Sequence, residues 1–413
     1  MRFSIDELMR QVNCSKFPDR WREIYDEAMA DYEANGCDLL DPAYYDRLHG
    51  QYGMLEKYLD VYKQAASLVR ESEALSTFLA LLCYVLRDRE HCLMEMYELV
   101  RPVSPDGGHD LAYDMLTGLA VCSQADACYA RLKERKLPED LIRRVMCSPE
   151  KGVGEYAKRN GGAYGYHLAG WFQHSINAKL FPIHQLEIEI NTTMHAMAAV
   201  FRNGAGEEMV LAKDMPVHRD GFFLGSKHFE DEEGSWTATL TETEDSWSGY
   251  PIDERGYVLP KTVTLPKSEW KLVLQTGDPV VHVHIPAAGS FAPEVIDETL
   301  RQAKVFLKNY YPDYAYKAVC CHSWLMDPQL EEFVGENANI VRFGKRFRKI
   351  CVKSAGQAVF YFVYQAPSGT VLTPDALPEN TRLERAIKAH YQSGKVVYEM
   401  FGYFFPEEEN AEA

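Results

Sequence analysis

The sequence predicts an α+β protein, with an all-helical N-terminal domain at residues 1–150 followed by a mixed α/β domain at residues 151–413. Three observations carry this prediction. Apolar residues recur with helical spacing through most of the first 150 residues. Glycines accumulate between Pro149 and Gly165, which is typical of a domain join. Beyond that segment, apolar and polar residues alternate as they do in strands.

About seven helices are expected in the first domain. Trp21, Ile24, Tyr25, Ala28 and Met29 fall at i, i+3, i+4, i+7 and i+8, which places them on one helical face. Further helices are expected at 44–72, with a possible break at a glycine, and at 75–99, 110–121, 123–135 and 138–146.

Strands dominate the first half of the second domain. In segment 183–191, Leu186, Ile188 and Ile190 share one face, while Gln185, Glu187 and Glu189 share the other. Additional strands are expected at 193–201, 209–212, 235–241, 257–264 and 270–274, several of them separated by turn residues.

A strand–loop–helix–strand unit follows. Residues 280–285 form the strand, 286–292 a loop of small residues, 294–311 an amphipathic helix, and 318–325 the second strand. Asp327 and Pro328 are then expected as the N-cap and first residue of another helix. Strands at 349–353 and 358–364, a helix at 381–391 and a strand at 396–404 complete the fold.

Composition excludes several classes of protein. The net charge is −17 and basic residues cluster only at 345–349, whereas nucleic-acid binding needs a positive surface. No apolar window long enough to span a membrane occurs, and Asp6 and Glu7 interrupt the pattern of a secretory signal. The ten scattered cysteines favour reduced thiols in a cytoplasmic protein. The acidity either keeps the chain soluble or attracts a cationic amine substrate.

The small-residue loop is a candidate anion site. Backbone N–H groups at the start of a helix point toward an incoming anion, and Ala287, Ala288, Gly289 and Ser290 would let a phosphate approach them. Every strand–loop–helix unit offers some of this geometry, so the spacing alone does not decide the function.

Two histidines in the preceding strand are candidate catalytic or ligating groups. His282 and His284 are two residues apart, so both rings emerge from one face of the strand. His284, nearer the end of the strand, is the expected general base. A metal site would need a third ligand from His218, His322 or Asp327, and hydrogen-bonded histidines of a half-buried sheet are the alternative. Cys320, Cys321 and His322 are expected to pack, because neighbours on a strand face opposite sides.

Three segments together resemble bacterial proteins with a GNAT-like acyltransferase domain, of the N-acetyltransferase superfamily. They are VHVHIP at 281–286, LRQA at 300–303 and SWLMDPQL at 323–330. The resemblance extends over nearly the whole chain, because such proteins also place a helical domain before the GNAT-like one. It implies a largely antiparallel central sheet, in which 280–285 is the fourth strand and 318–323 the fifth.

The resemblance implies an acyl-CoA-dependent N-acyltransferase that acts on an amine of a small molecule or peptide. The expected catalytic residues are His284 and Asp327, and the expected acyl-CoA-binding residues are Ile285, Ala287, Ala288, Gly289 and Ser290. Acetyl-CoA or another acyl-CoA is the expected co-substrate, with no metal ion, nucleic acid or membrane as a partner. The oligomeric state is not indicated.

Two departures from the superfamily pattern keep alternatives open. Its loop of Arg or Gln followed by Gly-x-Gly or Gly-x-Ala is reduced here to Gly289. Arg342 stands where many members carry a tyrosine that protonates the departing thiolate, so Arg342, Lys345 and Arg346 are candidates for phosphate contacts instead. A catalytically degenerate binding or interaction protein is therefore the second hypothesis, and a metal-dependent hydrolase that uses His282 and His284 is the third.

Overall fold

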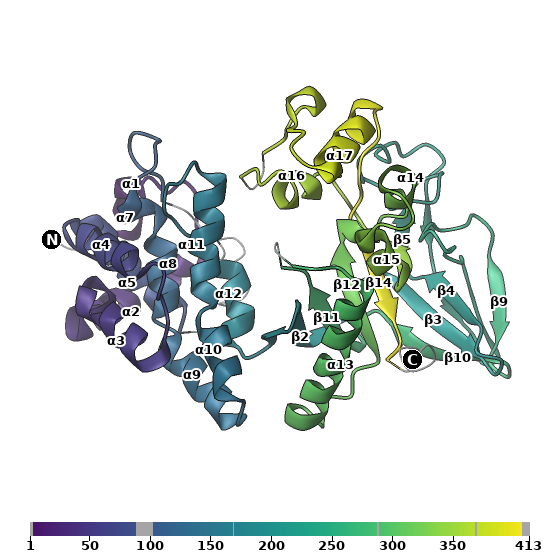
Figure 1. The fold of residues 1–413 in the computed structure, drawn as a ribbon, viewed down its shortest axis with the longest axis horizontal. Helices are drawn as coiled ribbons and strands as arrows, with labels where there is room; N and C mark the ends of the chain where they lie inside the picture. The colour runs from purple at the N-terminus through teal and green to yellow at the C-terminus, as the bar shows by residue number, and fades with distance from the viewer. Residues whose placement is uncertain (1–2, 88–101, 168, 287–288, 368–369, 407–413) are drawn as a thin grey trace. The chain divides into compact units, whose positions relative to one another are not determined.

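The chain folds into two units, Met1–Pro182 and Ile183–Ala413 (Figure 1). The computed structural model describes residues 3–87, 102–167, 169–286, 289–367 and 370–406. The first unit is helical and the second mixes strands and helices, which confirms the predicted α+β class. The division at Pro182 lies later in the chain than the expected domain end at residue 150.

The described part of the helical unit contains α-helices and a short 3-10 helix, η1 (Asp38–Leu40). The α-helices are α1 (Ile5–Gln11), α2 (Arg20–Asn35), α3 (Pro42–Tyr52), α4 (Leu59–Arg70), α5 (Glu73–Val85), α7 (Leu111–Asp114), α8 (Leu116–Cys122), α9 (Ala125–Glu134), α10 (Glu139–Met146), α11 (Ser148–Arg159) and α12 (Ala169–Ile176). The helix expected at 44–72 is divided at Gly53, whose φ of 69° ends α3 in the left-handed conformation. Of the helix expected at 75–99, the part from 88 onward lies outside the described residues.

The glycines at 152–165 permit close packing, which explains why they do not form the domain join. A Cβ added at Gly152 would lie 2.3 Å from the ring of Tyr166, and one at Gly165 would lie 2.5 Å from the ring of Tyr156. The Tyr166 N–H also donates to the Asp114 carbonyl at 2.8 Å. Segment 152–166 is thus held against α7 and belongs to the helical unit.

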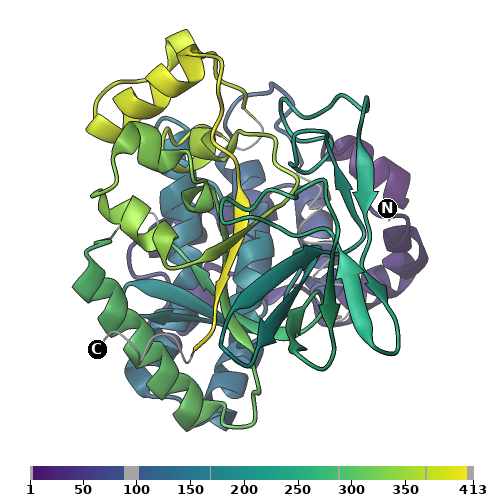
Figure 2. The same ribbon diagram turned by 90° about the vertical axis from the view of Figure 1, so that its right-hand side faces the viewer.

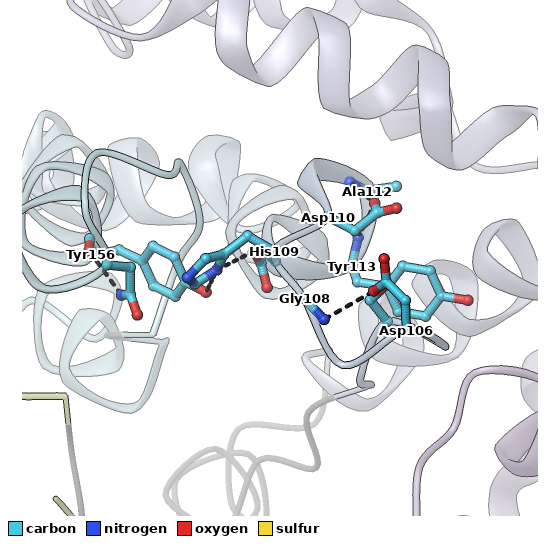
Figure 3. Close-up of polar contacts among 10 residues, drawn as sticks. Asp106, Gly108, His109, Asp110, Ala112, Tyr113 and Tyr156 are labelled. Atoms are coloured by element: carbon cyan, nitrogen blue, oxygen red, sulfur yellow. Dashed lines mark hydrogen bonds and ion pairs between the residues drawn. The ribbon is translucent and has the colours of Figure 1, made fainter.

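Side-chain hydrogen bonds also order the turn before α7 (Figure 3). The Asp106 carboxylate accepts the Gly108 N–H at 2.9 Å, and the Asp110 carboxylate accepts the Ala112 N–H at 2.8 Å as the N-cap of α7. His109 Nδ1 lies 3.1 Å from an Asp114 carboxylate oxygen. The two carboxylates thus accept backbone N–H groups that would otherwise have no hydrogen-bond partner in the turn and at the helix start, which is a structural role.

The centre of the second unit is a six-stranded sheet with the order β1-β2-β11-β12-β14-β13. These strands are β1 (Leu180–Ile183), β2 (Leu186–Thr193), β11 (Pro279–His284), β12 (Ala318–Ser323), β13 (Arg348–Cys351) and β14 (Met400–Phe404). Only the pairing of β11 with β12 is described as parallel, whereas the described pairings of β2 with β11, and of β12 and β13 with β14, are antiparallel. The predicted largely antiparallel sheet is confirmed.

The parallel pair is joined by α13 (Pro293–Tyr310), the longest helix of the unit. Its apolar stripe is buried, as the spacing predicted, at Ile296, Leu300, Ala303 and Leu307. The helices η2 (Trp324–Met326), α14 (Leu330–Val334) and α15 (Asn339–Lys345) follow β12. The helices α16 (Ala358–Phe362), η3 (Pro374–Ala376) and α17 (Arg382–Gln392) come next in the chain, and α17 lies near one end of the central sheet (Figures 1 and 2).

Smaller antiparallel sheets are inserted between β2 and β11 in the chain. Their strands are β3 (Ala198–Asn203), β4 (Glu208–Ala212), β5 (Met215–Val217), β6 (Trp236–Ala238), β7 (Thr241–Glu242), β8 (Ser246–Gly249), β9 (Val263–Pro266) and β10 (Trp270–Gln275). Ala199, Phe201, Leu211 and Leu265 form a common core under these sheets. None of the described helices is long and apolar enough to cross a membrane.

Several sequence-based assignments in this unit were wrong. Residues 358–362 form α16 and not a strand. The adjacent residues Val359 and Phe360 are both buried, which a short helix allows, whereas neighbours on a strand point to opposite faces. The strand expected at 257–264 begins only at Val263, and β5 and β8 were missed. Asp327 does not cap α14, whose N-cap is Gln329.

Candidate active site

One face of the central sheet gathers polar side chains. Residues paired across neighbouring strands point to the same face, and His282 pairs with Glu189 while His284 pairs with Glu187. His282 also pairs with Cys320 of β12. β12 adds His322, which pairs with Phe401 of β14. The sheet therefore concentrates imidazoles and carboxylates that are far apart in the sequence.

His284 and Glu189 form an ion-pair-like contact at the end of β11. His284 Nε2 lies 2.8 Å from Oε2 of Glu189, and their side chains are 26% and 11% exposed. A carboxylate in this position fixes the orientation of the ring and stabilises an imidazolium if the ring gains a proton. His284 is thus partly open to solvent and has a built-in partner, as a general base requires.

Three further histidine rings lie beside this pair. The His195 ring, from the loop between β2 and β3, stacks on His282 with 5.4 Å between centroids, and His195 Nε2 lies 3.1 Å from His322 Nδ1. The rings of His282 and His284 are 6.1 Å apart. The edge of Phe401 contacts both His195 and His282. His195 and His322 have more of their surface open to solvent than His282, which is 4% exposed, although neighbouring groups crowd all three rings.

The environment keeps these rings neutral near pH 7. Burial lowers the pKa of His282 to about 3, and the neighbouring His284 and His195 act in the same direction. Desolvation at this crowded face, followed by the influence of His195, lowers the pKa of His322 to about 4. The Nε2 of His282 has no hydrogen-bond partner within the described part of the chain. His282 and His322 are therefore neutral and only weakly basic near pH 7.

Asp327 lies in a different environment. It is 3% exposed, and its carboxylate accepts the Tyr398 N–H at 2.7 Å, the Gln329 N–H at 2.9 Å and the Gln329 side-chain amide at 3.1 Å. Burial raises its pKa to about 6, although these hydrogen bonds lower it. The contacts join η2 to the segment before β14, so they give Asp327 a structural role and leave the predicted catalytic role as a prediction.

The predicted acyl-CoA loop is described only in part, because Ala287 and Ala288 lie outside the described residues. Ile285 is half-buried after β11, and Gly289 and Ser290 are exposed. Gly289 has a φ of 152°, which favours glycine, and a Cβ there would lie 1.5 Å from the terminal amide of Gln185, which would have to move. Among the described residues, no side chain caps the start of α13.

A basic side chain directly after α15 lies near that helix start. The Arg346 guanidinium is 2.5 Å from a carboxylate oxygen of Asp297 and 3.5 Å from the Pro293 carbonyl, both in the first turns of α13. Arg342 is one turn earlier on α15 and is exposed. Segment 342–349 holds five cations and no acidic residue in a chain of net charge −17, so this side of α13 is favourable for an anion.

The metal alternative gains no support from the described part of the chain. No group of three or more histidine, cysteine or acidic side chains there is arranged to hold a metal ion. His218, a possible third ligand, is buried against Phe229 and pairs with Asp220. Burial raises the pKa of the Cys321 thiol to about 12 and that of Cys320 well above its usual range. The packing role expected for these two cysteines fits their burial.

Sequence comparison identifies the family. A family model of the GNAT-like C-terminal domain matches residues 198–404, half of the chain. The chain belongs to this family. The match includes His282, His284 and His322, whereas Glu189 and His195 precede it. No curated protein matches the sequence at a significant level.

Solved structures share the fold of this GNAT-like chain over almost its whole length. An acyltransferase in complex with decanoyl-CoA and teicoplanin has a TM-score of 0.61 and 15% identity, and covers 98% of this chain and 99% of that chain. An acyltransferase in complex with CoA and 10C-teicoplanin has a TM-score of 0.62 and 16% identity, over 98% and 99%. At such identities the likeness shows the fold, including the helical unit before the GNAT-like domain.

Proposed function

We propose that the chain is an acyl-CoA-dependent N-acyltransferase with an amine acceptor. The observation that carries the proposal is the contact between His284 and the Glu189 carboxylate at the end of β11, in a fold shared with acyltransferases crystallised with decanoyl-CoA or CoA. In GNAT enzymes the thioester lies between the fourth and fifth strands, which correspond here to β11 and β12, so a base at the end of β11 would be near it.

The proposed reaction is a direct transfer. His284 takes a proton from the acceptor ammonium or amine, and Glu189 stabilises the resulting imidazolium. The amine nitrogen attacks the thioester carbonyl, a C–N bond forms, and the C–S bond breaks to release CoA thiolate. The thiolate needs a proton, and the His195–His322 pair, joined at 3.1 Å, offers a route for one. A neutral imidazole can give up its N–H proton while its other nitrogen accepts one, so the pair can relay a proton without becoming charged.

The anionic end of the donor is proposed to bind at the start of α13. Ser290, Gly289 and the uncapped helix start would approach the pyrophosphate, and Arg342 and Arg346 would supply the positive charge that the reduced glycine loop lacks. The catalytic assignment of Asp327 and the loop assignment of Ile285, Ala287 and Ala288 stay part of this proposal.

The proposed acceptor is a small-molecule or peptide amine. One structural neighbour was crystallised with teicoplanin, which supports a small-molecule acceptor, and the net charge of −17 favours a cationic amine. The free cysteines favour a cytoplasmic location. A binding protein that lacks catalysis is the second candidate, favoured by the single loop glycine and by the absence of the usual tyrosine.

Thermal unfolding with donor analogues tests donor binding. A ligand at 100 times its Kd stabilises the folded state by about 2.7 kcal/mol, which raises the Tm of a unit of this size by several degrees. We expect decanoyl-CoA or another acyl-CoA to raise the transition of the α/β unit, while adenosine alone does not. An unchanged transition with every CoA species at millimolar concentration would contradict donor binding.

Replacing Arg342 by alanine should weaken acyl-CoA binding about tenfold, because one charge-assisted phosphate contact contributes about 1.4 kcal/mol. The kcat at saturating donor should be unchanged, since Arg342 is proposed to contact the donor phosphate and not the reacting carbonyl or the base. The matched control is Arg301→Ala, which removes the same charge from an exposed position on α13 that is paired with Glu298. Equal Kd values for the two variants would remove Arg342 from the donor site.

A further inference from the structure

The strand β14 reaches the candidate active site through Phe401. Phe401 pairs with His322 of β12, and the edge of its ring contacts His195 and His282. Residues two apart on an extended chain share a face, so Glu399 is expected on the same face as Phe401. Because β12 and β14 are antiparallel, Glu399 lies beyond His322, toward the end of β12.

The backbone before β14 shows that this alternation continues past the end of the strand. The Tyr398 N–H donates to the carboxylate of Asp327, which follows β12, at 2.7 Å. The Glu399 N–H donates to Oγ of Ser354, which follows β13, at 2.9 Å. Successive N–H groups thus point to opposite sides, as in a strand. The Tyr398 ring packs on Phe222, with 4.8 Å between centroids, so the Glu399 side chain points to the other face, which carries the histidines.

Glu399 brings a carboxylate to this face without a cation to balance it. Its side chain is half-buried, and within the described part of the chain its carboxylate has neither a hydrogen bond nor an ion pair. Burial raises the pKa of Glu399, and no described cationic side chain counteracts the rise. By contrast, Glu189 on the same face is paired with His284. A carboxylate removed from water is costly unless it is paired, and a cationic group of a ligand would offset that cost.

We propose that Glu399 binds a second cationic group of the acceptor, while the reacting amine lies at His284. This inference rests on the proposed acyl transfer and narrows its acceptor to amines that carry two positive charges. Glu399 takes no part in the chemical step, because its role is to hold the far end of the acceptor.

The sheet sets the spacing between the two charges. His284 of β11 and His322 of β12 are level with each other, because each lies two residues beyond a paired residue, and His322 is level with Phe401. β14 is the second strand from β11. With strands about 4.8 Å apart and a step of two residues of about 6.7 Å, the Cα atoms of His284 and Glu399 are roughly 12 Å apart. The two nitrogens of an extended 1,8-diaminooctane have a similar spacing.

The test compares 1,8-diaminooctane with octylamine, which has the same carbon chain and one charge fewer, as acceptors for the full-length chain with saturating acyl-CoA. We expect kcat/KM to be about 10- to 100-fold higher for the diamine, because a charge-assisted contact with a half-buried carboxylate strengthens binding by this factor. In Glu399→Gln this preference should fall to the value that two equivalent reacting amines give, through a higher KM for the diamine and not through kcat.

The matched control is Glu336→Gln. It removes one negative charge from an exposed position of the same unit, so it should keep the preference for the diamine if the local contact and not the overall charge is responsible. A thermal unfolding curve accompanies each variant. Glu399→Gln should not lower the Tm, because it removes a carboxylate that is half-buried and has no partner in the described part of the chain.

Equilibrium binding separates this inference from acyl transfer itself. The Kd of 1,8-diaminooctane is measured by calorimetry in the presence of CoA, where no acyl group is available for transfer. A Kd at least about tenfold higher in Glu399→Gln than in Glu336→Gln supports the inference even when no amine is acylated. Equal Kd values for the two variants, or equal kcat/KM for the diamine and octylamine in the unchanged chain, would overturn it, although acylation of either amine would leave the proposed transferase activity standing.

Discussion

Replacing His284 by glutamine lowers kcat by about 10²- to 10⁴-fold in the proposed mechanism, which is the usual contribution of a general base. Glutamine is able to hydrogen-bond to Glu189 but cannot take the amine proton. The His284 side chain is 26% exposed, so its replacement should change the unfolding temperature little. The measurement is the release of free CoA thiol at saturating donor, next to a thermal unfolding curve of the same preparation.

Two further variants show whether the fall in kcat of His284→Gln is caused by removal of the general base. Glu189→Gln should lower kcat less than His284→Gln, because it removes the partner of the ring and not the ring itself. His109→Gln replaces an exposed histidine of the helical unit that also lies 3.1 Å from a carboxylate, and it should keep full turnover. Undiminished kcat in His284→Gln would assign the base to another residue.

Replacing Asp327 by alanine should destabilise the protein by about 3 kcal/mol at pH 5, because buried donors then lose their acceptor. The Tyr398 N–H and the two Gln329 donors are the groups left without it. Chemical denaturation, followed at the unfolding transition of the α/β unit, measures this loss of stability. The same variant tests the predicted catalytic role, because protein that is folded at low temperature and retains kcat would leave Asp327 with a structural role alone.

The cost of this substitution should depend on pH. The pKa of Asp327 is about 6 in the folded protein, whereas the pKa of an aspartate in an unfolded chain is about 4. The folded state therefore binds the proton more tightly, and the stability that the protonated carboxyl contributes is complete below pH about 4 and declines as pH rises through about 6. The difference in unfolding free energy between the unchanged chain and Asp327→Ala should therefore shrink as pH rises from about 4 to above about 6, by roughly 3 kcal/mol at most. A cost that grows with pH would instead show that the three donors favour the ionised form.

The strand–loop–helix–strand unit was predictable because its signals are local. The apolar stripe of α13 and the alternation in the earlier strand β2 are periodic within single elements, so their bounds were predicted to within a few residues. By contrast, the run of aromatic residues at Phe360–Phe362 has strand propensity, yet it lies in α16, where tertiary packing overrides propensity. Gly152 and Gly165 looked like a linker because sequence cannot show that two tyrosine rings occupy the space next to them.

Only the site residues that lie on a single strand could be predicted from the sequence. His284 was assigned from its position at the end of β11, but its partner Glu189 lies 95 residues earlier and meets it only through the pairing of β2 with β11. His195 comes from a loop without periodicity, so no local signal marked it. Arg342 and Arg346 were recognised as candidates for phosphate contacts, while the approach of Arg346 to α13 required the fold.

Acyl transfer itself tests the central claim most directly. The purified chain is incubated with decanoyl-CoA or a shorter acyl-CoA and with amines of several classes (an amino sugar, a polyamine, a lysine peptide and a glycopeptide), and free CoA and acylated amine are measured by mass spectrometry. The account predicts equal amounts of CoA and a new amide with at least one amine, both lost in His284→Gln. Acyl-CoA that binds but yields neither product with any amine would contradict it and favour a binding protein.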